Sequence, residues 1–442
     1  MAMADATAGL DAGVDAEADQ KRQLRRAVIA STVGTAIEWY DFFLYSTLTS
    51  LVFVKLYFPN SDPLVGTLQA FSVYFVGFVA RPIGAAIFGH YGDRIGRKAT
   101  LVSTLLLMGI ATFFVGLVPS YDVIGIWGAV ILTVLRFIQG IGVGGEWGGS
   151  VLLSMEWAKT NKHRGFITSW PQFGVPMGVF LANLAVLAFS GMDNATFMSW
   201  GWRIPFLLSA VLVAVGLYIR LGVLETPTFR RLQKENKISN QPVLDVLKRH
   251  PKAVLLSALA RTGQQAPFYI YTAFVFSYGI TQGMSRNFLL TAVLCTALVS
   301  FITLPLTGHL SDLFGRKRFY LIGLVIGAVY SFVYFAGLDS GVAAISFVAI
   351  LFSLPAHDPT YGPQAALIAE SFPADLRYSG ASIGYQLASV FAGGPAPLVA
   401  TYLLATYKSG TPIAIYMALC CLVSFIAVMF MTDYTNKDID AA

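Results

Sequence analysis

The sequence predicts an all-α membrane protein with twelve transmembrane helices in two similar six-helix bundles. Three observations support this fold class. The 442-residue chain is 56% hydrophobic and only 12% charged, whereas soluble domains carry about 25% charged residues. Apolar runs of about twenty residues, the length that crosses a bilayer, recur along the chain. A ten-residue polar segment is repeated 219 residues later, close to half the chain length, which indicates two homologous membrane bundles.

The repeated segment has the pattern Gly-His-x-x-Asp-x-x-Gly-Arg-Lys and stands at residues 89–98 and 308–317. We expect each copy to form a short cytoplasmic loop between the second and third helices of its half; one copy alone would equally suit an ordinary basic loop. The aspartate suits an ion pair with an arginine or a helix N-cap, and the second glycine permits a tight turn. The loop residues expected to close the cytoplasmic side are Gly89, Asp93, Arg94, Gly96, Arg97, Lys98, Asp312, Gly315 and Arg316.

The N-terminal part is predicted to contain a polar tail and one bundle. Residues 1–26 are rich in Ala and Asp and end in a basic cluster, so we expect a disordered cytoplasmic tail with a basic anchor. The first apolar segment is long enough to span the membrane and needs no cleavable signal. The N-terminal bundle covers residues 27–222, with spans expected at 27–52, 66–89, 99–118, 123–154, 165–190 and 203–222.

The C-terminal part repeats this plan after a linker. Residues 223–252 form the long polar stretch inside the chain and are predicted to be a partly helical cytoplasmic linker between the halves. Residues 433–442 are expected to be a short cytoplasmic tail. The C-terminal bundle covers residues 253–432, with spans expected at 253–278, 286–309, 318–337, 342–366, 380–404 and 412–432.

Basic residues fix the expected orientation. Most of the 30 Lys and Arg residues fall on one side of the predicted membrane, in the tail, the loops and the linker. Because positive loops stay on the cytoplasmic side, both termini are expected in the cytoplasm of a multi-pass protein of the cell (inner) membrane. This placement explains the basic balance without a nucleic-acid partner. The three cysteines lie in apolar runs and suggest neither a disulfide framework nor a metal site, and no cofactor is expected.

A second echo relates the two halves. Three polar residues recur at an offset of 213 or 214: Glu156, Arg164 and Gln172 return as Glu370, Arg377 and Gln386. The glutamates and arginines fall at the cytoplasmic ends of the fourth, fifth, tenth and eleventh spans. We expect them to pair with the arginines of the repeated loops and to act as latches on the cytoplasmic side. The alternative is that they are ordinary helix-end charges.

Ionisable residues inside a bilayer are costly and usually functional, and the first helix contains two. Glu38 and Asp41 are three residues apart, so they share a helix face. Two carboxylates this close disfavour each other's charge, and one of them is expected to carry a proton near neutral pH. The alternative is that one carboxylate pairs with an arginine and never titrates.

The second helix contains Arg81, followed directly by Pro82, near its middle. A buried guanidinium presents a rigid fork that matches a carboxylate, so Arg81 is a candidate for binding an acidic substrate. A structural ion pair with Glu38 or Asp41 is the alternative.

The fourth helix combines two charges with many glycines. Arg136 and Glu146 are ten residues apart, close to three turns, and lie on nearly the same face. Glu146 is either a second proton site or the structural partner of a group on the first or fifth helix. The glycines at 140, 144, 145, 148 and 149 have the small-xxx-small spacing that lets helices approach closely.

Several stretches together resemble a known family. The repeated loop resembles the signature of the major facilitator superfamily, in which a degenerate second copy is typical. The runs EWYDF at 38–42, GGEWGG at 144–149 and GWRIPF at 201–206 resemble its metabolite:proton symporter branch, and the resemblance extends from about residue 28 to residue 431. It implies two bundles around a central cavity that work by alternating access. It also implies that Arg81 holds a substrate carboxylate and that Arg136 takes part in proton coupling.

The second half offers further candidates. Arg261, Gln264 and Gln265 lie in the seventh helix and are expected to bind substrate. His357 and Asp358 lie in the tenth helix between two prolines and are a candidate proton relay; a buried structural histidine is the alternative. Pro355 and Pro359 suggest a kinked helix, where transporters expose backbone to a cavity. Among the aromatic residues, Tyr40 and Tyr361 are candidates for contact with the substrate.

The sequence therefore predicts a transporter, not an enzyme, that acts as a monomer in the lipid bilayer. The expected function is inward proton symport of a small organic acid, such as shikimate, a di- or tricarboxylate or an aromatic acid. One alternative is a proton symporter of a zwitterionic osmolyte such as proline or glycine betaine. Another is a proton-driven exporter, because the run GVPMG at 174–178 faintly resembles the antiporter pattern of the superfamily, although it lacks the fuller glycine set of that pattern. A membrane enzyme or sensor is disfavoured because the sequence shows no catalytic constellation, phosphate loop or soluble signalling domain.

Overall fold

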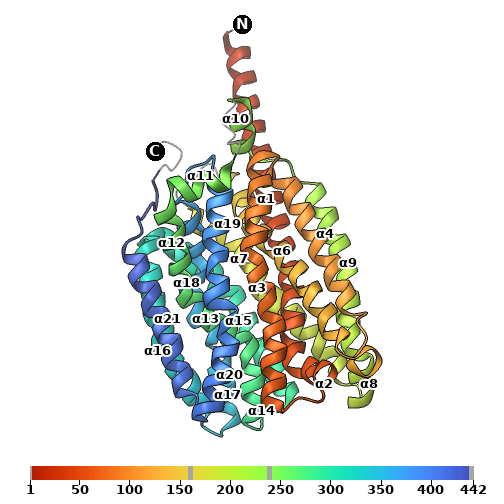
Figure 1. Cartoon of the computed structure of the whole chain (residues 1–442). Helices are drawn as coiled ribbons and strands as arrows, with labels where there is room; N and C mark the ends of the chain where they lie inside the picture. The colour runs from red at the N-terminus through yellow and green to blue at the C-terminus, as the bar shows by residue number, and fades with distance from the viewer. Residues whose placement is uncertain (1, 158–162, 236–240, 438–442) are drawn as a thin grey trace.

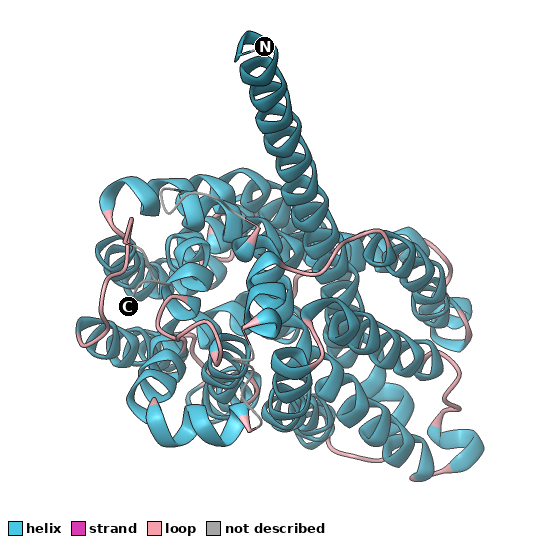
Figure 2. Ribbon diagram, turned by 90° about the horizontal axis from the view of Figure 1, so that it is seen from above, coloured by secondary structure: helices cyan, strands magenta, loops and turns pink. Residues whose placement is uncertain are grey.

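The structure is a computed structural model that describes residues 2–157, 163–235 and 241–437, and within these ranges its regular elements are all helices. The first half of the chain, red to yellow-green in Figure 1, lies beside the second half, green to blue. The two chain ends lie at the same end of the molecule, which we call the terminal face. Figure 2 looks down on this face and shows the helices of both halves nearly end-on.

The described part of the N-terminal half contains one very long helix and five further long ones. Residues 2–26, for which the sequence predicts a disordered tail, instead form the first turns of α1, in keeping with the high helix propensity of their many alanines. The elements are α1 (Ala2–Leu48), η1 (Thr49–Phe53), α2 (Val54–Tyr57), α3 (Pro63–Arg94), α4 (Arg97–Val115), α5 (Tyr121–Ile124), α6 (Trp127–Glu156), α7 (Arg164–Ser190), α8 (Asn194–Ser199), η3 (Gly201–Arg203) and α9 (Ile204–Leu221).

Two short helices of the linker precede the C-terminal half. The linker helices α10 (Pro227–Lys234) and α11 (Pro242–Arg249) lie at the terminal face (Figure 1). The elements of the second half are α12 (Pro251–Ala260), α13 (Thr262–Tyr269), η4 (Ile270–Phe274), α14 (Val275–Thr281), α15 (Arg286–Phe314), α16 (Arg316–Leu338), α17 (Ala343–Leu351), α18 (Ser353–Ala369), α19 (Arg377–Ala388), η5 (Ser389–Gly393), α20 (Pro395–Tyr407) and α21 (Thr411–Met429).

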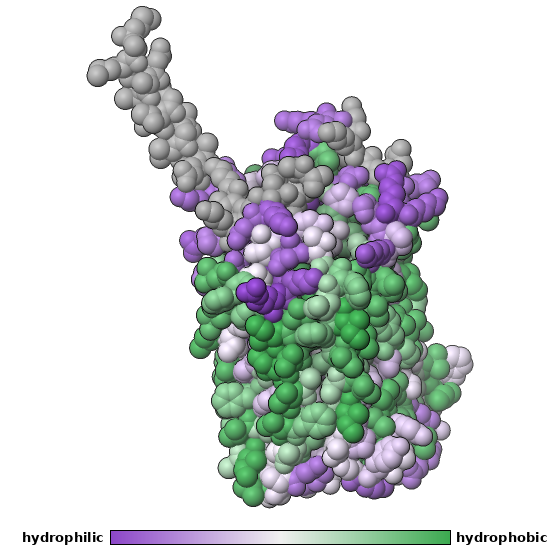
Figure 3. Space-filling view, turned by 90° about the vertical axis from the view of Figure 1, so that its left-hand side faces the viewer, coloured by the Kyte–Doolittle hydropathy of each residue, from purple (hydrophilic) through white to green (hydrophobic). Residues whose placement is uncertain are grey.

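Nine helical segments in the described part of the chain are long and apolar enough to cross a membrane by length and composition. The other three predicted spans correspond to α1, whose inner part carries Glu38 and Asp41, and to two interrupted segments, α12 to α14 and α17 to α18. The break before α18 lies at Phe352, three residues before Pro355, whose ring clashes with the carbonyl four residues earlier. The predicted interruption of the tenth span is therefore present. Figure 3 shows a wide hydrophobic band between two hydrophilic ends, as expected for a protein in a bilayer.

Close helix contacts position the interior charges. An added Cβ on Gly140 would lie 2.1 Å from the carbonyl oxygen of Gly77, and one on Gly144 would lie 2.1 Å from that of Arg81. Glycine is therefore required in α6 for its backbone to lie directly against α3, which agrees with the predicted packing role. Between the halves, α7 packs on α15 and α18, and α3 packs on α19 and α20.

Candidate functional site

Arg81 is a fully buried arginine of α3 at the contact between the two halves. Its Nη1 donates a hydrogen bond of 3.2 Å to the hydroxyl of Tyr269 in α13 of the other half. Its Nε and Nη2 have no hydrogen-bond partner. The guanidinium carbon lies 4.3 Å from the ring centre of Phe42 and 4.4 Å from that of Phe78. Because buried donors are rarely left unpaired, these two nitrogens suit a ligand with a carboxylate.

Arg136 of α6 is a second buried guanidinium against the same aromatic cluster. It lies 4.2 Å from the ring centre of Phe42 and 4.8 Å from that of Tyr74. Its Nη1 donates to Gln139 over 3.2 Å, whereas Nε and Nη2 have no hydrogen-bond partner. Phe42 thus contacts both guanidinium groups, and its position links the two arginines to helix α1.

The two acids of α1 are buried but do not form the ion pairs considered from the sequence. Among the described residues, neither Glu38 nor Asp41 lies within ion-pair distance of Arg81. One oxygen of Glu38 and both oxygens of Asp41 have no hydrogen-bond partner within the usual distance. The side chain of Thr112 lies near Asp41 and interacts with its carboxyl group. Both carboxyl groups are therefore available to bind a proton or to gain a partner in another conformation.

Glu146 of α6 has a partner that the sequence analysis did not single out. Its carboxylate forms an ion pair with Arg220 near the end of α9, and it accepts hydrogen bonds from Ser150 at 2.7 Å and Thr104 at 3.1 Å. One of the two alternatives for Glu146 was a structural partner on the first or fifth helix; in the structure the partner comes from the sixth helix instead. The presence of an arginine within the predicted sixth span was the available signal.

The polar groups of the seventh helix bind mainly to their own half. Arg261 donates to Gln364 over 3.3 Å and to the backbone carbonyl of Tyr385, and it lies 3.1 Å from the centre of the Tyr385 ring. Gln264 contacts His357 over 2.7 Å, and Gln265 donates to Ser389 over 2.9 Å. Arg261 is therefore already engaged, in contrast to Arg81.

The tenth helix places His357 beside Asp358, with 3.7 Å between Nδ1 and the carboxylate. Asp358 accepts hydrogen bonds from Ser300 over 2.8 Å and from Thr303. Hydroxyl groups thus hold Asp358, while the other ring nitrogen of His357 faces Gln264.

The two tyrosines proposed for substrate contact point in different directions. Tyr361 lies near the interior cluster, 6.3 Å from the ring of Phe268 and 3.5 Å from the Tyr385 hydroxyl. The hydroxyl of Tyr40 instead donates over 2.6 Å to the backbone of Pro205 in α9. Tyr40 therefore binds within its own half.

At the terminal face, the first repeated loop connects the two halves. Asp93 accepts hydrogen bonds from the backbone nitrogen and hydroxyl of Ser379, at 3.0 and 2.8 Å, in the first turn of α19. Arg97 lies 3.4 Å from both Asp93 and Glu156. Gly96 has φ of +114°, a conformation that favours glycine, and it begins the turn into α4.

The second repeated loop, which belongs to the second half, makes the corresponding contacts with a helix of the first half. Asp312 accepts hydrogen bonds from the backbone nitrogens of Gly165 and Phe166 in the first turn of α7, at 2.9 and 2.8 Å. Arg316 lies 3.1 Å from Asp312 and 3.2 Å from Glu370. The expected pairing of the loop arginines with the two echo glutamates is present in both halves.

The remaining loop residues complete this face. Glu370 also binds Arg164 of the other half over 3.0 Å. Arg377 donates to the backbone of Phe372 over 3.0 Å, Lys98 donates to the backbone of Leu221 over 2.8 Å, and Arg94 lies beside His90. Arg164 and Glu370 thus add a charged contact between the halves to the two aspartate contacts. The other loop glycines are Gly89, which packs against Ser379, and Gly315, with φ of +90°.

Between the terminal face and Arg81 lies a further layer of contacts between the halves. Gln172 of α7 accepts a hydrogen bond from the indole of Trp147 over 2.7 Å and donates to the carbonyl of Tyr361 over 3.3 Å. Gln386 of α19 donates to the carbonyl of Val143 over 3.2 Å. The ring of Trp147 is stacked on that of Tyr385, with centres 3.5 Å apart. The recurrence of Gln172 as Gln386 was visible in the sequence, but nothing in the sequence predicted that the rings of Trp147 and Tyr385 would stack.

The opposite end of the molecule is also bonded across the halves. Ser277 donates to Ser50 over 3.0 Å, Ser190 donates to Asn287 over 3.0 Å, and Arg286 donates to the carbonyl of Ser190 over 3.2 Å. The interior arginines therefore lie between two ends at which the halves are hydrogen-bonded to each other.

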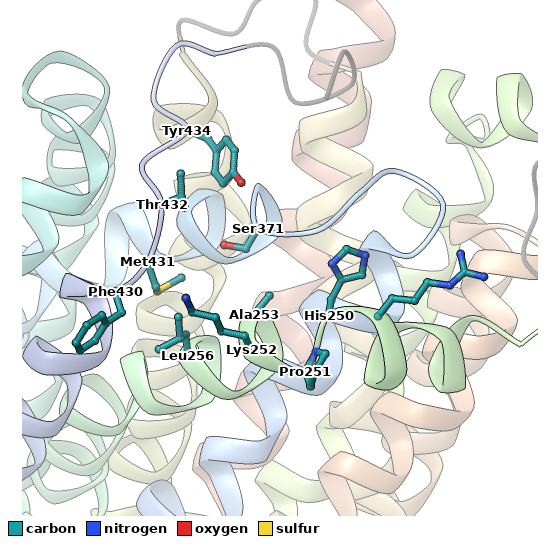
Figure 4. A pocket seen from close by; sticks show the side chains of 11 residues that line it. His250, Pro251, Lys252, Ala253, Leu256, Ser371, Phe430, Met431, Thr432 and Tyr434 are labelled. Carbon is teal, nitrogen blue, oxygen red and sulfur yellow. The ribbon is translucent and has the colours of Figure 1, made fainter.

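A cavity of about 290 Å³ lies elsewhere, at the terminal face of the second half. Figure 4 shows His250 and Lys252 on its wall below Thr432 and Tyr434. Its lining contains none of the residues predicted to bind substrate, so it is separate from the interior site.

Comparison with known proteins places these features in a family context. The family model described as Major Facilitator Superfamily matches residues 32–397. The shikimate transporter of Escherichia coli K12 is 41% identical over 416 residues, which cover 92% of this chain and 94% of the relative. An inner membrane metabolite transport protein of the same organism is 39% identical over 421 residues, covering 94% and 95%. The proline/betaine transporter of that organism is 30% identical over 435 residues, covering 95% and 86%.

A solved structure supports the same fold. The proton:xylose symporter bound to 6-bromo-6-deoxy-D-glucose superposes with a TM-score of 0.77, covering 95% of this chain and 98% of that chain, at 18% sequence identity. At this identity the likeness concerns the fold alone.

Proposed function

Because the chain belongs to the Major Facilitator Superfamily, we propose that it is a proton symporter that carries a small organic acid into the cell by alternating access. The observation that carries this proposal is the buried guanidinium of Arg81, with two unpaired nitrogens at the contact between the halves. A carboxylate that accepts from both nitrogens forms the forked pair for which arginine is suited. The hydroxyl of Tyr269 lies beside the same guanidinium and ties the binding of substrate to the second half.

Charge balance supports an acidic substrate that moves with a proton. The described membrane interior of the first half includes three carboxyl groups and three guanidinium groups: Glu38, Asp41, Glu146, Arg81, Arg136 and Arg220. When all are charged they cancel, and when one carboxyl group binds a proton the interior gains one net positive charge. A carboxylate anion restores neutrality. Since burying net charge in a membrane is costly, the proton and the anion favour each other's binding.

The same geometry disfavours a quaternary ammonium substrate at this place. Such cations are usually bound by the faces of aromatic rings. Here Phe42 and Phe78 already face Arg81, and Phe42, Tyr45 and Tyr74 already face Arg136. The protein's own cations occupy these faces, so we favour the organic acid over the osmolyte carried by the proline/betaine relatives.

We propose that the terminal face is cytoplasmic and forms the inner gate. Its basic loops and linker fit the cytoplasmic side of a bilayer. The contacts of Asp93 with α19, of Asp312 with α7 and of Glu370 with Arg164 hold the halves together there. These contacts must break for the interior site to open inward. Conversely, the contacts around Ser50 and Ser190 must break for it to open outward.

The test is uptake into proteoliposomes under a pH gradient with the acidic side outside. The substrates are shikimate, 2-oxoglutarate, citrate, benzoate, proline and glycine betaine, each with and without a protonophore. We expect accumulation of shikimate or another acid that the protonophore abolishes and that Arg81→Gln abolishes too. Uptake of betaine or proline alone would contradict the proposal, as would acid uptake that ignores the gradient.

A further inference from the structure

Arg220 is a buried arginine whose place in the proposed mechanism has not been assigned. It lies one residue before the end of α9, and its side chain is only 3% exposed. Its guanidinium pairs with Glu146 of α6 and donates to the backbone carbonyl of Leu101 in α4. Its Nε has no hydrogen-bond partner. One side chain thus joins α4, α6 and α9 in the membrane interior.

The first helix leaves room for this guanidinium. An added Cβ on Gly34 of α1 would lie 2.0 Å from Nη2 of Arg220 and 2.6 Å from its central carbon. Real Cβ atoms do not approach other atoms so closely, so a residue larger than glycine at position 34 would displace the guanidinium. Arg220 therefore lies directly against the backbone of α1.

Glu38 follows Gly34 by one helical turn and lies on the same side of α1. One of its oxygens has no hydrogen-bond partner. The charged groups that act on it lie on four helices: Glu146 of α6, Arg220 of α9, Arg81 of α3 and Asp41 of α1 itself. Arg220 thus acts electrostatically on two carboxyl groups, one of which it already binds.

We propose that Arg220 is a positioning residue for proton coupling, which holds Glu146 as a carboxylate and leaves Glu38 to bind the transported proton. When Glu38 is charged, both carboxylates attract the guanidinium and draw α1 toward α6 and α9. When Glu38 takes a proton from outside, Arg220 is attracted only to Glu146, and α1 is no longer drawn toward α6 and α9. The inference rests on the proposed symport function and adds a residue and a proton site to it.

The movement of α1 would reach the substrate site through Phe42. Glu38 and Phe42 are four residues apart in α1, and Phe42 contacts the guanidinium groups of both Arg81 and Arg136. A change in the charge of Glu38 would therefore alter the position of a ring that lies against both arginines. This gives a physical route from the proton to the acid.

The experiment uses the double variant Glu146→Gln/Arg220→Gln, which removes both members of the ion pair, so that neither is left without the other as a buried charge. Wild-type protein is measured beside it in proteoliposomes, with the substrate that the uptake panel identifies. The readouts are accumulation under a pH gradient, counterflow without a gradient, and the pH profile of counterflow. We expect the double variant to keep counterflow at a reduced rate, to lose accumulation to a concentration ratio of about 1, and to show a shifted pH profile.

Two outcomes would overturn the inference. If the double variant accumulates substrate as the wild type does, with the same pH profile, the ion pair is only structural. If the wild type shows counterflow but no response to the pH gradient, the symport function itself is wrong and the inference falls with it. The wild-type arm thus separates the two failures.

A second variant displaces Arg220 without changing any charge. Gly34→Ala puts a methyl group where the guanidinium lies, so we expect it to lower accumulation severalfold more than counterflow. Gly222→Ala, two residues after Arg220, is the control, because its Cβ would meet its nearest neighbour at an ordinary 3.4 Å. Equal behaviour of the two alanine variants would contradict the role of Arg220.

Discussion

The terminal face and the membrane interior differ in how evenly the two halves contribute. At the terminal face each half supplies an aspartate that binds the first turn of a helix in the other half, and an arginine that binds a glutamate of its own half. In the interior, three described guanidinium groups of the first half, those of Arg81, Arg136 and Arg220, have nitrogens without a hydrogen-bond partner, whereas Arg261 of the second half is engaged. A motion shared by both halves needs a duplicated gate, but binding one substrate needs only one free cation.

The largest effect is expected from comparing the two interior arginines. Arg81→Gln would remove the two donors that we propose for the substrate carboxylate, each worth about 1.5–3 kcal/mol, so kcat/KM should fall by a hundredfold or more. Arg81→Lys should not restore it, because an ammonium lacks the fork. Arg261→Gln should reduce kcat/KM by about tenfold at most and should lower thermal stability instead.

Initial uptake rates in proteoliposomes, normalised to folded protein, measure both arginine variants. Thermal unfolding of the purified variants is the control that separates lost folding from lost binding. Equal losses of kcat/KM at the two positions would contradict the proposed difference between the halves.

The next largest effect is expected within the gate, where the two aspartates are not equally engaged. Asp312 accepts from two backbone nitrogens of α7 and binds Arg316, whereas one oxygen of Asp93 has no hydrogen-bond partner. Asp312→Asn should therefore open the terminal face more than Asp93→Asn. Each lost charge-assisted bond is worth about 1.5–3 kcal/mol.

The measurement is alkylation of Ser169→Cys, a buried position beside Gly308, after replacement of the three native cysteines. A membrane-impermeant maleimide is applied from the terminal face. We expect its rate to rise about tenfold with Asp312→Asn and less with Asp93→Asn. A larger rise with Asp93→Asn would show that the first loop is the stronger lock.

A smaller effect is expected from pH at Glu370, which lies at the gate outside the membrane spans. Burial raises the pKa of this carboxyl group, and the neighbouring Arg316 and Arg164 offset part of that rise. Because the pKa is higher in the closed gate than in water, closure is favoured at low cytoplasmic pH and weakens as the pH rises through the raised pKa.

Because the thiolate is the species that reacts with maleimide, each alkylation rate of Ser169→Cys is divided by the rate of a free thiol at the same pH. The normalised rate should be lower at a cytoplasmic pH of about 5 than at about 8. In Glu370→Gln this dependence should disappear. A closed gate that loosens on acidification would reverse the sign and contradict the account of Glu370.

The smallest effect is expected at the two glutamines between the gate and the interior. Gln172 makes two hydrogen bonds and joins Trp147 to the second half, whereas Gln386 donates one bond to the first half. A neutral hydrogen bond contributes about 0.5–1.5 kcal/mol. Gln172→Leu should therefore lower the initial rate of uptake severalfold, and Gln386→Leu should lower it less. A null effect for both would leave the stacked rings of Trp147 and Tyr385 as the contact that matters in this layer.

The sequence predicted what it repeats or what it places against the membrane. The two loops and the pair Glu156 and Glu370 were visible because they recur at nearly the same offset, and Arg81 was visible because a charge stands where a membrane segment should be apolar. The partner of Glu146 was not visible, because it depends on how α9 rotates against α6. The hydroxyl of Tyr40 points to Pro205 for the same reason: helix rotation, not composition, decides which neighbour a side chain meets.

The most direct test of the central claim is proton entry coupled to substrate entry. Proteoliposomes with a trapped pH dye receive the sodium salt of the transported acid, without a pH gradient at the start. We predict that the lumen acidifies at a rate proportional to substrate uptake in the wild type. In Arg81→Gln the pH of the lumen should stay constant. Substrate entry in the wild type without acidification would contradict proton symport.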